Sequence, residues 1–514
     1  MSYTHHDRLT ALDTTFLTLE DASSHMHVGS VGVFDGAPLR DAHGGLDMAR
    51  IMALSEAALA RQPRFRQKLA HVPLLGRPVW VDDERFNLHY HVRHAALPPP
   101  GDERQLKRLV GRIMSQQLDR GKPLWEMWYV EGLRGGRFAV IAKVHHCMVD
   151  GIAGVDLMAA LLSPDPQAVP APAPAWIPRP APSPLQLLGS ELAHRASLPL
   201  ALARGAIDAA LRPRRAAGAL ATGVESVGEA LWGALRPASP TPLNCDIGPH
   251  RRFDWLRLDL EAVKQIRHGS GATINDVVLA IVAGAMRRFL RGRGEQVEEL
   301  TFRAMVPVST RAADQHGRLG NRVSLLMAPL PIDERDPAAR LRRVVETMQG
   351  VKGSNQKRGT ELIEEASDWL PGGLFARIAR LGMYTTPFNL VVTNVPGPQV
   401  PIYLLGAPLR AAYPLVPLFS NQALGIALFS YDGGLFWGFN SDWDAVPDLH
   451  RLVEAVDAEF LALWRAAAGS GTAPRSALAE APPAGTRRRR PTAATRRRPR
   501  PGPTRRAVRR SARR

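Results

Sequence analysis

Cysteine and long apolar runs are scarce in this chain of 514 residues. It holds two cysteines, Cys147 and Cys245, which excludes a disulfide framework and favours a reducing compartment. Its longest apolar stretches, such as Val277–Met286 and Ala423–Phe429, are well short of the roughly 20 residues that a transmembrane helix needs. The N-terminus, MSYTHHDRLTALD, lacks the apolar segment of a secretory signal. We therefore expect a cytoplasmic protein without an integral membrane segment.

Positive charge is concentrated at the C-terminus. The net charge of the chain is +18. Residues 471–514 contain 15 arginines and a single acidic residue, Glu480, so positive and negative charges nearly cancel in the rest of the chain. A segment so rich in arginine, proline and alanine has almost nothing to bury, which predicts a disordered tail over residues 469–514. Its arginine clusters suit anionic lipid headgroups or non-specific contact with nucleic acid, and a dispensable solvated extension is the third alternative. We expect no specific nucleic-acid partner.

The body of the chain alternates between strand and helix patterns, interrupted once by a proline-rich stretch. Residues 163–183 are too rich in proline for a regular element, and the apolar patches that follow suggest a partly helical crossover. The sequence therefore predicts an N-terminal domain over residues 1–162, a linker and crossover over 163–249, and a C-terminal domain over 250–468. Strand patterns occur at Val28–Phe34, Phe138–Val144, Trp255–Leu260, Phe302–Pro307, Val323–Leu330, Phe388–Thr393, Leu424–Ser430 and around His89 and His91, and helical patterns at Leu46–Gln62, Ile152–Leu162, Asn275–Leu290 and His450–Ala468.

The strongest local signal for chemistry is the run HHCMVDG, residues 145–151, between a predicted strand and a predicted helix. The imidazole of His145 or His146 titrates near neutrality and could take a proton from a hydroxyl. Asp150 could brace the loop through an arginine, and Gly151 would let the backbone turn tightly into the helix. Two adjacent histidines are, taken alone, more typical of a packed or surface pair. No Cys, His and Glu set has the spacing of a zinc site, so we expect no metal.

The HHxxxDG spacing resembles the active-site motif of the chloramphenicol acetyltransferase-like acyltransferases, which include the condensation domains of peptide synthetases. Other motifs resemble one branch of that superfamily, the bacterial wax ester synthase/diacylglycerol acyltransferases. They are Pro123-Leu124-Trp125 (PLW), Asn275-Asp276 in ATINDVVLA (ND) and Asn394-Val395-Pro396-Gly397-Pro398 (NVPGP). The opening LTALDTTFLTLEDASSHMHVG is also similar to that of the family, so the resemblance extends from about Leu9 to Trp464.

This resemblance implies an α/β fold of two chloramphenicol acetyltransferase-like domains joined by a long crossover, with the active site at their interface. It implies transfer of a long-chain acyl group from acyl-CoA to diacylglycerol or to a fatty alcohol, with no cofactor besides the co-substrate acyl-CoA. His146 would be the general base, acting without an acyl-enzyme, and His145 would orient it. Asp150 would pair with an arginine. Arg66 in QPRFR is the candidate, because its setting is similar to a His-Pro-x-Leu pattern in condensation domains.

Two of the motifs also have structural explanations. Thr273 and Asp276 have the spacing of a capping box, whereas Asn275 would place an amide in the substrate site. The PLW motif suits a brace near the cleft better than a chemical role. Both motifs are kept as candidates to line the substrate site.

Other functions fit parts of the sequence. A condensation-like enzyme would take its acyl group from a carrier-protein thioester, but no carrier or adenylation domain adjoins the body. A non-catalytic protein of lipid surfaces or nucleic acid would not need the His146–Asp150 spacing. We expect acyl-CoA and diacylglycerol or a long-chain alcohol as partners. The tail would hold this cytoplasmic enzyme on the inner membrane face or on lipid droplets.

Overall fold

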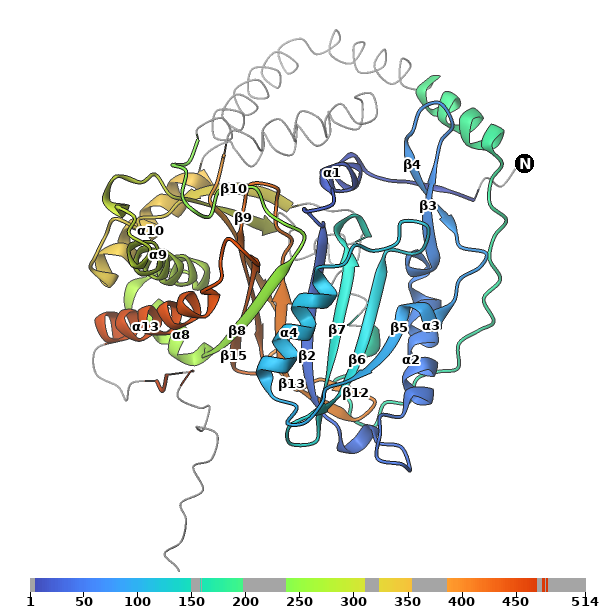
Figure 1. Ribbon diagram of the computed structural model, residues 1–514, viewed down its shortest axis with the longest axis horizontal. Coiled ribbons are helices and arrows are strands. Elements are labelled where there is room, and N and C mark those ends of the chain that lie inside the picture. The colour runs from blue at the N-terminus through green and yellow to red at the C-terminus, as the bar shows by residue number, and fades with distance from the viewer. Residues whose placement is uncertain are drawn as a thin grey trace, which may run out of the picture. The chain divides into compact units, whose positions relative to one another are not determined.

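The computed structural model describes residues 5–148, 158, 160–196, 237–309, 323–353, 386–468, 474–476 and 478. These residues form two six-stranded sheets, a three-stranded sheet and the helices that pack on them (Figure 1). Residues 1–478 make one compact unit, and residues 479–514, the second unit, lie outside the described part of the chain. The mixed α/β architecture is the one that the sequence predicted.

The first six-stranded sheet has the strand order β12-β13-β2-β7-β6-β5. Its strands are β2 (His27–Asp35), β5 (Val92–Ala96), β6 (Trp125–Leu133), β7 (Arg137–His145), β12 (Tyr403–Leu404) and β13 (Ala407–Leu415), and the nearby helices are α1 (Ala11–Leu19), α2 (Met48–Arg61), α3 (Leu88–His91) and α4 (Glu103–Met114). Every residue of β7 after Arg137 is buried, as expected of the run FAVIAKV. β7 lies between β2 and β6 and pairs antiparallel with both, so its end is held firmly.

The second six-stranded sheet has the order β10-β9-β11-β14-β15-β8. Its strands are β8 (Arg251–Asp259), β9 (Arg303–Ser309), β10 (Val323–Pro329), β11 (Leu390–Pro396), β14 (Leu424–Tyr431) and β15 (Gly434–Asp442). The helices α8 (Leu260–Ser270), α9 (Ile274–Gly292), α10 (Pro337–Gly353) and α13 (Leu449–Ala468) gather beside it (Figure 1). α9 is buried at nearly every position and shares the largest apolar core with α13 and the sheet.

One strand crosses between the two halves of the chain. β13 pairs antiparallel with β2 from Leu409 opposite Phe34 to Leu415 opposite Gly29. Residues that the sequence placed in the C-terminal domain therefore complete the sheet of the N-terminal domain, an exchange that the sequence-based division did not include. The two halves also meet where α4 packs on β8, because a Cβ at Gly111 would lie 2.8 Å from the carbonyl oxygen of Arg251.

Most predicted elements occur with their ends shifted by one or two residues, but one was wrong. FNLHYHV is not a strand, because Leu88–His91 forms the helical turn α3, whose cap is the side chain of Asn87. Seven of the eleven residues of the predicted helix at 152–162 lie outside the described residues, and of the others 158, 160 and 161 are helical. The proline-rich residues 163–183 contain no helix, and a helix follows at residues 184–196.

No single helix in the described part of the chain is long and apolar enough to cross a membrane. Only the pair α8 and α9, bent by 100° at its break, passes the length and composition test.

Candidate active site

The candidate site lies where β7 ends and the short 3-10 turn η3 (His146–Met148) begins. The backbone N–H of His145 donates to the carbonyl of Leu124 on one side, at 2.9 Å. The N–H of His146 donates to the carbonyl of Met26 on the other side, at 2.8 Å. Both histidines are thus fixed by neighbouring strands before their side chains make any contact.

The two imidazoles lie in different surroundings. His145 is fully buried, whereas His146 is partly exposed and stacks on Phe16 of α1, with ring centroids 3.8 Å apart and planes 22° from parallel. Burial among protein atoms, with a smaller contribution from His145, lowers the pKa of His146 to about 4. The ring of His146 is therefore neutral at physiological pH, the state in which it can accept a proton.

His145 has a contact at each ring nitrogen. Its Nδ1 accepts the backbone N–H of Cys147 at 3.1 Å, so the ring proton is on Nε2. This Nε2 faces the carboxylate of Glu20, 3.6 Å from Oε2. Glu20 follows the last residue of α1 directly. A buried carboxylate therefore selects the tautomer of His145, and that tautomer holds the first peptide of η3.

Glu20 has two further polar neighbours, of which Arg120 donates hydrogen bonds to it. Its Oε1 lies 3.4 Å from Nε2 of His27 on β2, and its Oε2 accepts hydrogen bonds from Arg120 at 3.0 and 2.6 Å. Burial alone would raise the pKa of Glu20, but the contacts with His145, His27 and Arg120 outweigh it and hold the pKa far below its ordinary value. The group is a permanent anion beneath the histidine pair. Burial lowers the pKa of His27 to about 3.

The PLW motif lies next to the site and has a structural contact of its own. Leu124 and Trp125 are buried, and the indole N–H of Trp125 donates to the carbonyl of Phe65 at 2.8 Å. His91 stacks on the indole at 4.6 Å between centroids, and its Nδ1 lies 2.8 Å from the carbonyl of Trp125. With the hydrogen bond from His145 to Leu124, these contacts support the brace interpretation.

The capping box predicted for the ND motif is confirmed. Thr273 accepts the N–H of Asp276 at 3.2 Å, and the Asp276 carboxylate accepts the N–H of Thr273 at 2.8 Å. Asn275 is half-buried in the first turn of α9. Its proposed place in the substrate site stays a prediction.

Three further predicted site residues are also untested. Asp150 and Gly151 lie outside the described residues. Arg66 is buried, with its guanidinium 5.1 Å from the ring centroid of Trp176 and 5.9 Å from that of Phe86. Its pairing with Asp150 stays a prediction.

The loop before β2 connects the histidines to the second half of the chain. The hydroxyl of Ser24 donates to the carbonyl of Leu418 at 2.8 Å, and Arg251 donates to the carbonyl of Ser23. Met26, the partner of His146, lies two residues beyond Ser24. The site is therefore at the junction of the two halves, as predicted.

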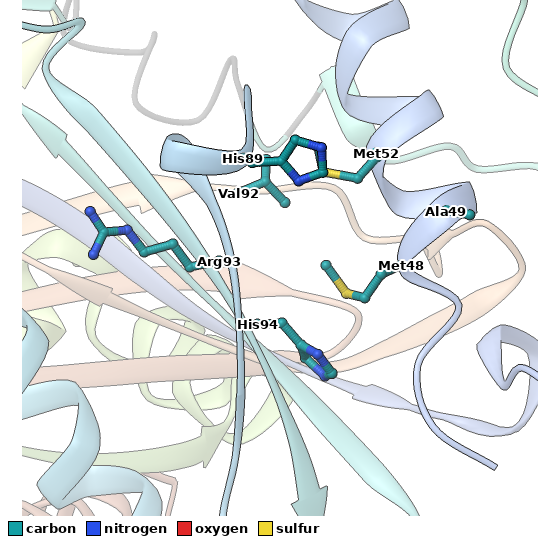
Figure 2. Close-up of a pocket in the computed structure, with 7 residues that line it drawn as sticks. All are labelled: Met48, Ala49, Met52, His89, Val92, Arg93 and His94. Carbon is teal, nitrogen blue, oxygen red and sulfur yellow. The ribbon is translucent and has the colours of Figure 1, made fainter. Parts of the chain in front are cut away.

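The structure also contains a pocket of about 600 Å³ elsewhere, which Figure 2 shows. Its lining residues are Met48, Ala49, Met52, His89, Val92, Arg93 and His94. None of the predicted site residues lines it, and we do not assign it to catalysis. Among the described residues, no group of three or more His, Cys, Asp and Glu is arranged to hold a metal ion.

Sequence reasoning missed Glu20, Arg120 and Phe16. The available signal was the opening LTALDTTFLTLEDASSHMHVG, in which an acidic residue closes an apolar helix shortly before two histidines. Met26 and His27, which belong to the same opening, are both buried.

The fold and the position of this histidine pair define a class, the chloramphenicol acetyltransferase-like acyltransferases. Within that class, residues 9–278 match the catalytic domain of the wax ester synthase/diacylglycerol acyltransferases, and residues 319–463 match their C-terminal domain. The chain belongs to this family of acyltransferases.

The chain is similar to proteins named as diacylglycerol O-acyltransferases. The chain is 36% identical over 454 residues to a putative diacylglycerol O-acyltransferase of Mycobacterium tuberculosis, covering 86% of this chain and 87% of that one. It is 33% identical to a probable diacylglycerol O-acyltransferase of the same organism, covering 88% and 94%.

Among solved structures, the wax ester synthase/diacylglycerol acyltransferase from Marinobacter aquaeolei VT8 is 27% identical, with a TM-score of 0.62 over 90% of this chain and 100% of that one. The first condensation domain of the calcium-dependent antibiotic synthetase is 18% identical, with a TM-score of 0.54 over 92% of this chain and 98% of that one, a likeness of fold alone.

Proposed function

We propose that this enzyme transfers a long-chain acyl group from acyl-CoA to the hydroxyl of diacylglycerol, of a long-chain alcohol, or of both. The observation that carries the proposal is the neutral, partly exposed imidazole of His146 at the junction of the two halves, in a chain of this family. Both acceptors are apolar alcohols, and the relatives are named for diacylglycerol and wax ester activities.

The chemistry is a single displacement. The acceptor hydroxyl gives its proton to His146 while its oxygen attacks the thioester carbonyl. The carbon–sulfur bond then breaks, and the CoA thiolate takes the proton back from the imidazolium, which gives an ester and free CoA. Because Nδ1 of His146 is enclosed by protein atoms, Nε2 is the nitrogen that reaches the hydroxyl. Neither a cofactor nor an acyl-enzyme is needed.

Glu20 and His145 position this base. The carboxylate fixes the tautomer of His145, and His145 accepts the N–H of Cys147, which directly follows the base. A base held in this way loses little freedom when substrate arrives, and correct placement of reacting groups contributes strongly to rate.

Release of free thiol from palmitoyl-CoA tests the proposal, with diacylglycerol and hexadecanol offered separately and together. Mass spectrometry of the products names the acceptor. We expect His146→Ala to lower turnover about 10²–10⁴-fold, the usual contribution of a general base, and His145→Ala to lower it less.

His94→Ala is a matched control, because His94 pairs with Glu131 on the same sheet without touching the site. If His145→Ala abolished turnover while His146→Ala kept it, the base would be the other imidazole. If both variants stayed active, the mechanism would be wrong.

We also propose that the protein works in the cytoplasm as a peripheral enzyme. The arginine-rich tail would adsorb to anionic lipid on the inner membrane face or on lipid droplets, where the acceptors dissolve. The support for this is the charge of the tail and the apolar nature of both acceptors.

A further inference from the structure

The hairpin of β3 (Gln67–His71) and β4 (Pro78–Asp82) and the helix of residues 184–196 form a small packed unit. Figure 1 shows this helix beside the loop end of the hairpin. Its own apolar cluster consists of Val72, Val79, Val81 and Leu187, with Ala70, Leu75 and Leu188 packed against it. The helix is therefore anchored by one face.

A buried carboxylate also joins the helix to its neighbours. Glu191 is buried and lies 3.2 Å from Arg8, 3.3 Å from Arg77 and 3.0 Å from Arg195. One carboxylate cannot neutralise three guanidinium groups, and the three arginine side chains are 15–37% exposed. Glu191 is the only acidic residue of the helix, and the loop Val72–Arg77 contains none. The unit therefore presents a surplus of positive charge.

The outward side of the unit is apolar. Leu74 at the hairpin tip is 95% exposed, and Leu185 and Leu192 on the helix are 81% and 54% exposed. Leu185, Gly189 and Leu192 are spaced by four and three residues and form one exposed stripe, opposite the face that packs on the hairpin. Exposed apolar clusters rimmed by polar groups mark interaction surfaces.

Leu74 is also in an unfavourable backbone conformation, with φ 64°. Glycine, which has no Cβ, or asparagine, whose short polar side chain can hydrogen-bond locally, adopts this conformation more readily. Folding thus does not favour leucine here, and a contact outside the chain would account for it.

We propose that this unit docks on an anionic phospholipid surface. Leu74, Leu185 and Leu192 would enter the boundary of the acyl chains, while the arginines around Glu191 would meet the phosphate groups. A lipid surface fits better than a protein partner, because apolar side chains and unneutralised cations together match the boundary between acyl chains and anionic headgroups. The inference rests on the proposed function only in that the acceptor is a lipid, and it is independent of the tail.

Vesicle binding of the full chain tests it, with vesicles of phosphatidylcholine alone and with added phosphatidylglycerol. Raising salt from about 0.15 M to about 1 M shortens the screening length from about 8 to about 3 Å and suppresses binding through the charges of the tail. We expect apolar binding to persist at high salt. Leu74→Ser and Leu192→Ser should each weaken it by about tenfold, equivalent to about 1.4 kcal/mol.

Val169→Ser and Val400→Ser are the controls, because these valines are 87% and 53% exposed but lie outside the hairpin and the helix. Equal vesicle binding by the leucine variants and these controls would overturn the proposal, as would complete loss of wild-type binding at high salt. A change of oligomeric state in the leucine variants without vesicles would assign the surface to a second copy instead. An inactive wild type that still binds through the leucines would refute the proposed function and leave the docking surface standing.

Discussion

Replacement of Glu20 by glutamine tests how the site is held together. The amide keeps the size of the side chain but removes the charge that faces His145, His27 and Arg120. Hydrogen bonds to charged groups contribute about 1.5–3 kcal/mol each. Water can solvate part of Arg120, whose side chain is 47% exposed. We therefore expect the free energy of unfolding to fall by about 1–3 kcal/mol, since water offsets part of the loss.

The effect on catalysis should be larger than this stability loss suggests. Glutamine can donate to His145 as well as accept from it, so the N–H of Cys147 alone is left to select the tautomer, and the turn that carries His146 loses part of its support. A displacement of about 1 Å can lower the rate about 10²-fold. We expect kcat to fall about 10–100-fold at saturating acyl-CoA while KM changes little, because the base and not the substrate contacts is disturbed.

Steady-state kinetics and thermal unfolding of the same preparation measure both effects. Glu459→Gln is a matched control, because Glu459 is a buried carboxylate that pairs with Arg288 and Arg340 far along the chain on α13. It should lose comparable stability and keep its kcat. Wild-type kcat in Glu20→Gln, or an equal loss of kcat in the control, would refute the positioning role.

Three further outcomes are expected. Burial lowers the pKa of His27 to about 3 and of His91 to about 4, below the ordinary 6.5. Below pH 6.5 the unfolded chain therefore binds more protons than the folded chain. Denaturant titrations should show that the free energy of unfolding falls as the pH is lowered toward 4, by up to about 1.4 kcal/mol per pH unit for each histidine. Trp125→Phe should lower stability by about 1–3 kcal/mol, because a buried carbonyl loses its donor, and change kcat by less than about tenfold, as kinetics beside thermal unfolding would show. Deletion of residues 471–514 should leave turnover on detergent-dispersed substrate nearly intact but weaken adsorption to anionic vesicles, and equal adsorption would remove the role of the tail.

Periodicity and motifs were enough to predict the mixed α/β fold, because the buried strands and amphipathic helices follow simple patterns. They failed where a distant contact decides the structure. β13 has the sequence APLRAAYPL, which shows no regular apolar and polar alternation, and it joins a sheet whose other main strands lie about 270–380 residues earlier, a pairing that no local pattern encodes. FNLHYHV alternates like a strand, but the cap of Asn87 and the stacking of His91 on Trp125 favour a helical turn.

Lys143 is a single residue for which the local sequence pattern predicts the strand but not the contact that the fold provides. The pattern of FAVIAKV predicts a buried strand and gives no reason for a cation inside it. In the structure its ammonium donates to the carbonyls of Ile113 and Gln116 at the end of α4, so the lysine caps a helix that lies far from it in sequence. Burial lowers its pKa to about 8. Only the folded chain reveals that partner.

For the histidine pair, the motif in the sequence and the contacts in the folded structure both contribute to the interpretation. The family resemblance implies different roles for the two adjacent imidazoles, with His146 as the base and His145 as the residue that orients it. The structure gives a physical reason for this difference. One nitrogen of His145 accepts a peptide N–H, the other faces a carboxylate across 3.6 Å, and the side chain is buried, so neither nitrogen is open to a substrate. His146 follows it in η3, is partly exposed and stacks on Phe16, and burial lowers its pKa to about 4. The surroundings of the first histidine suit an orienting role and the partial exposure of the second suits a reacting one, which supports our proposal that the second histidine is the base.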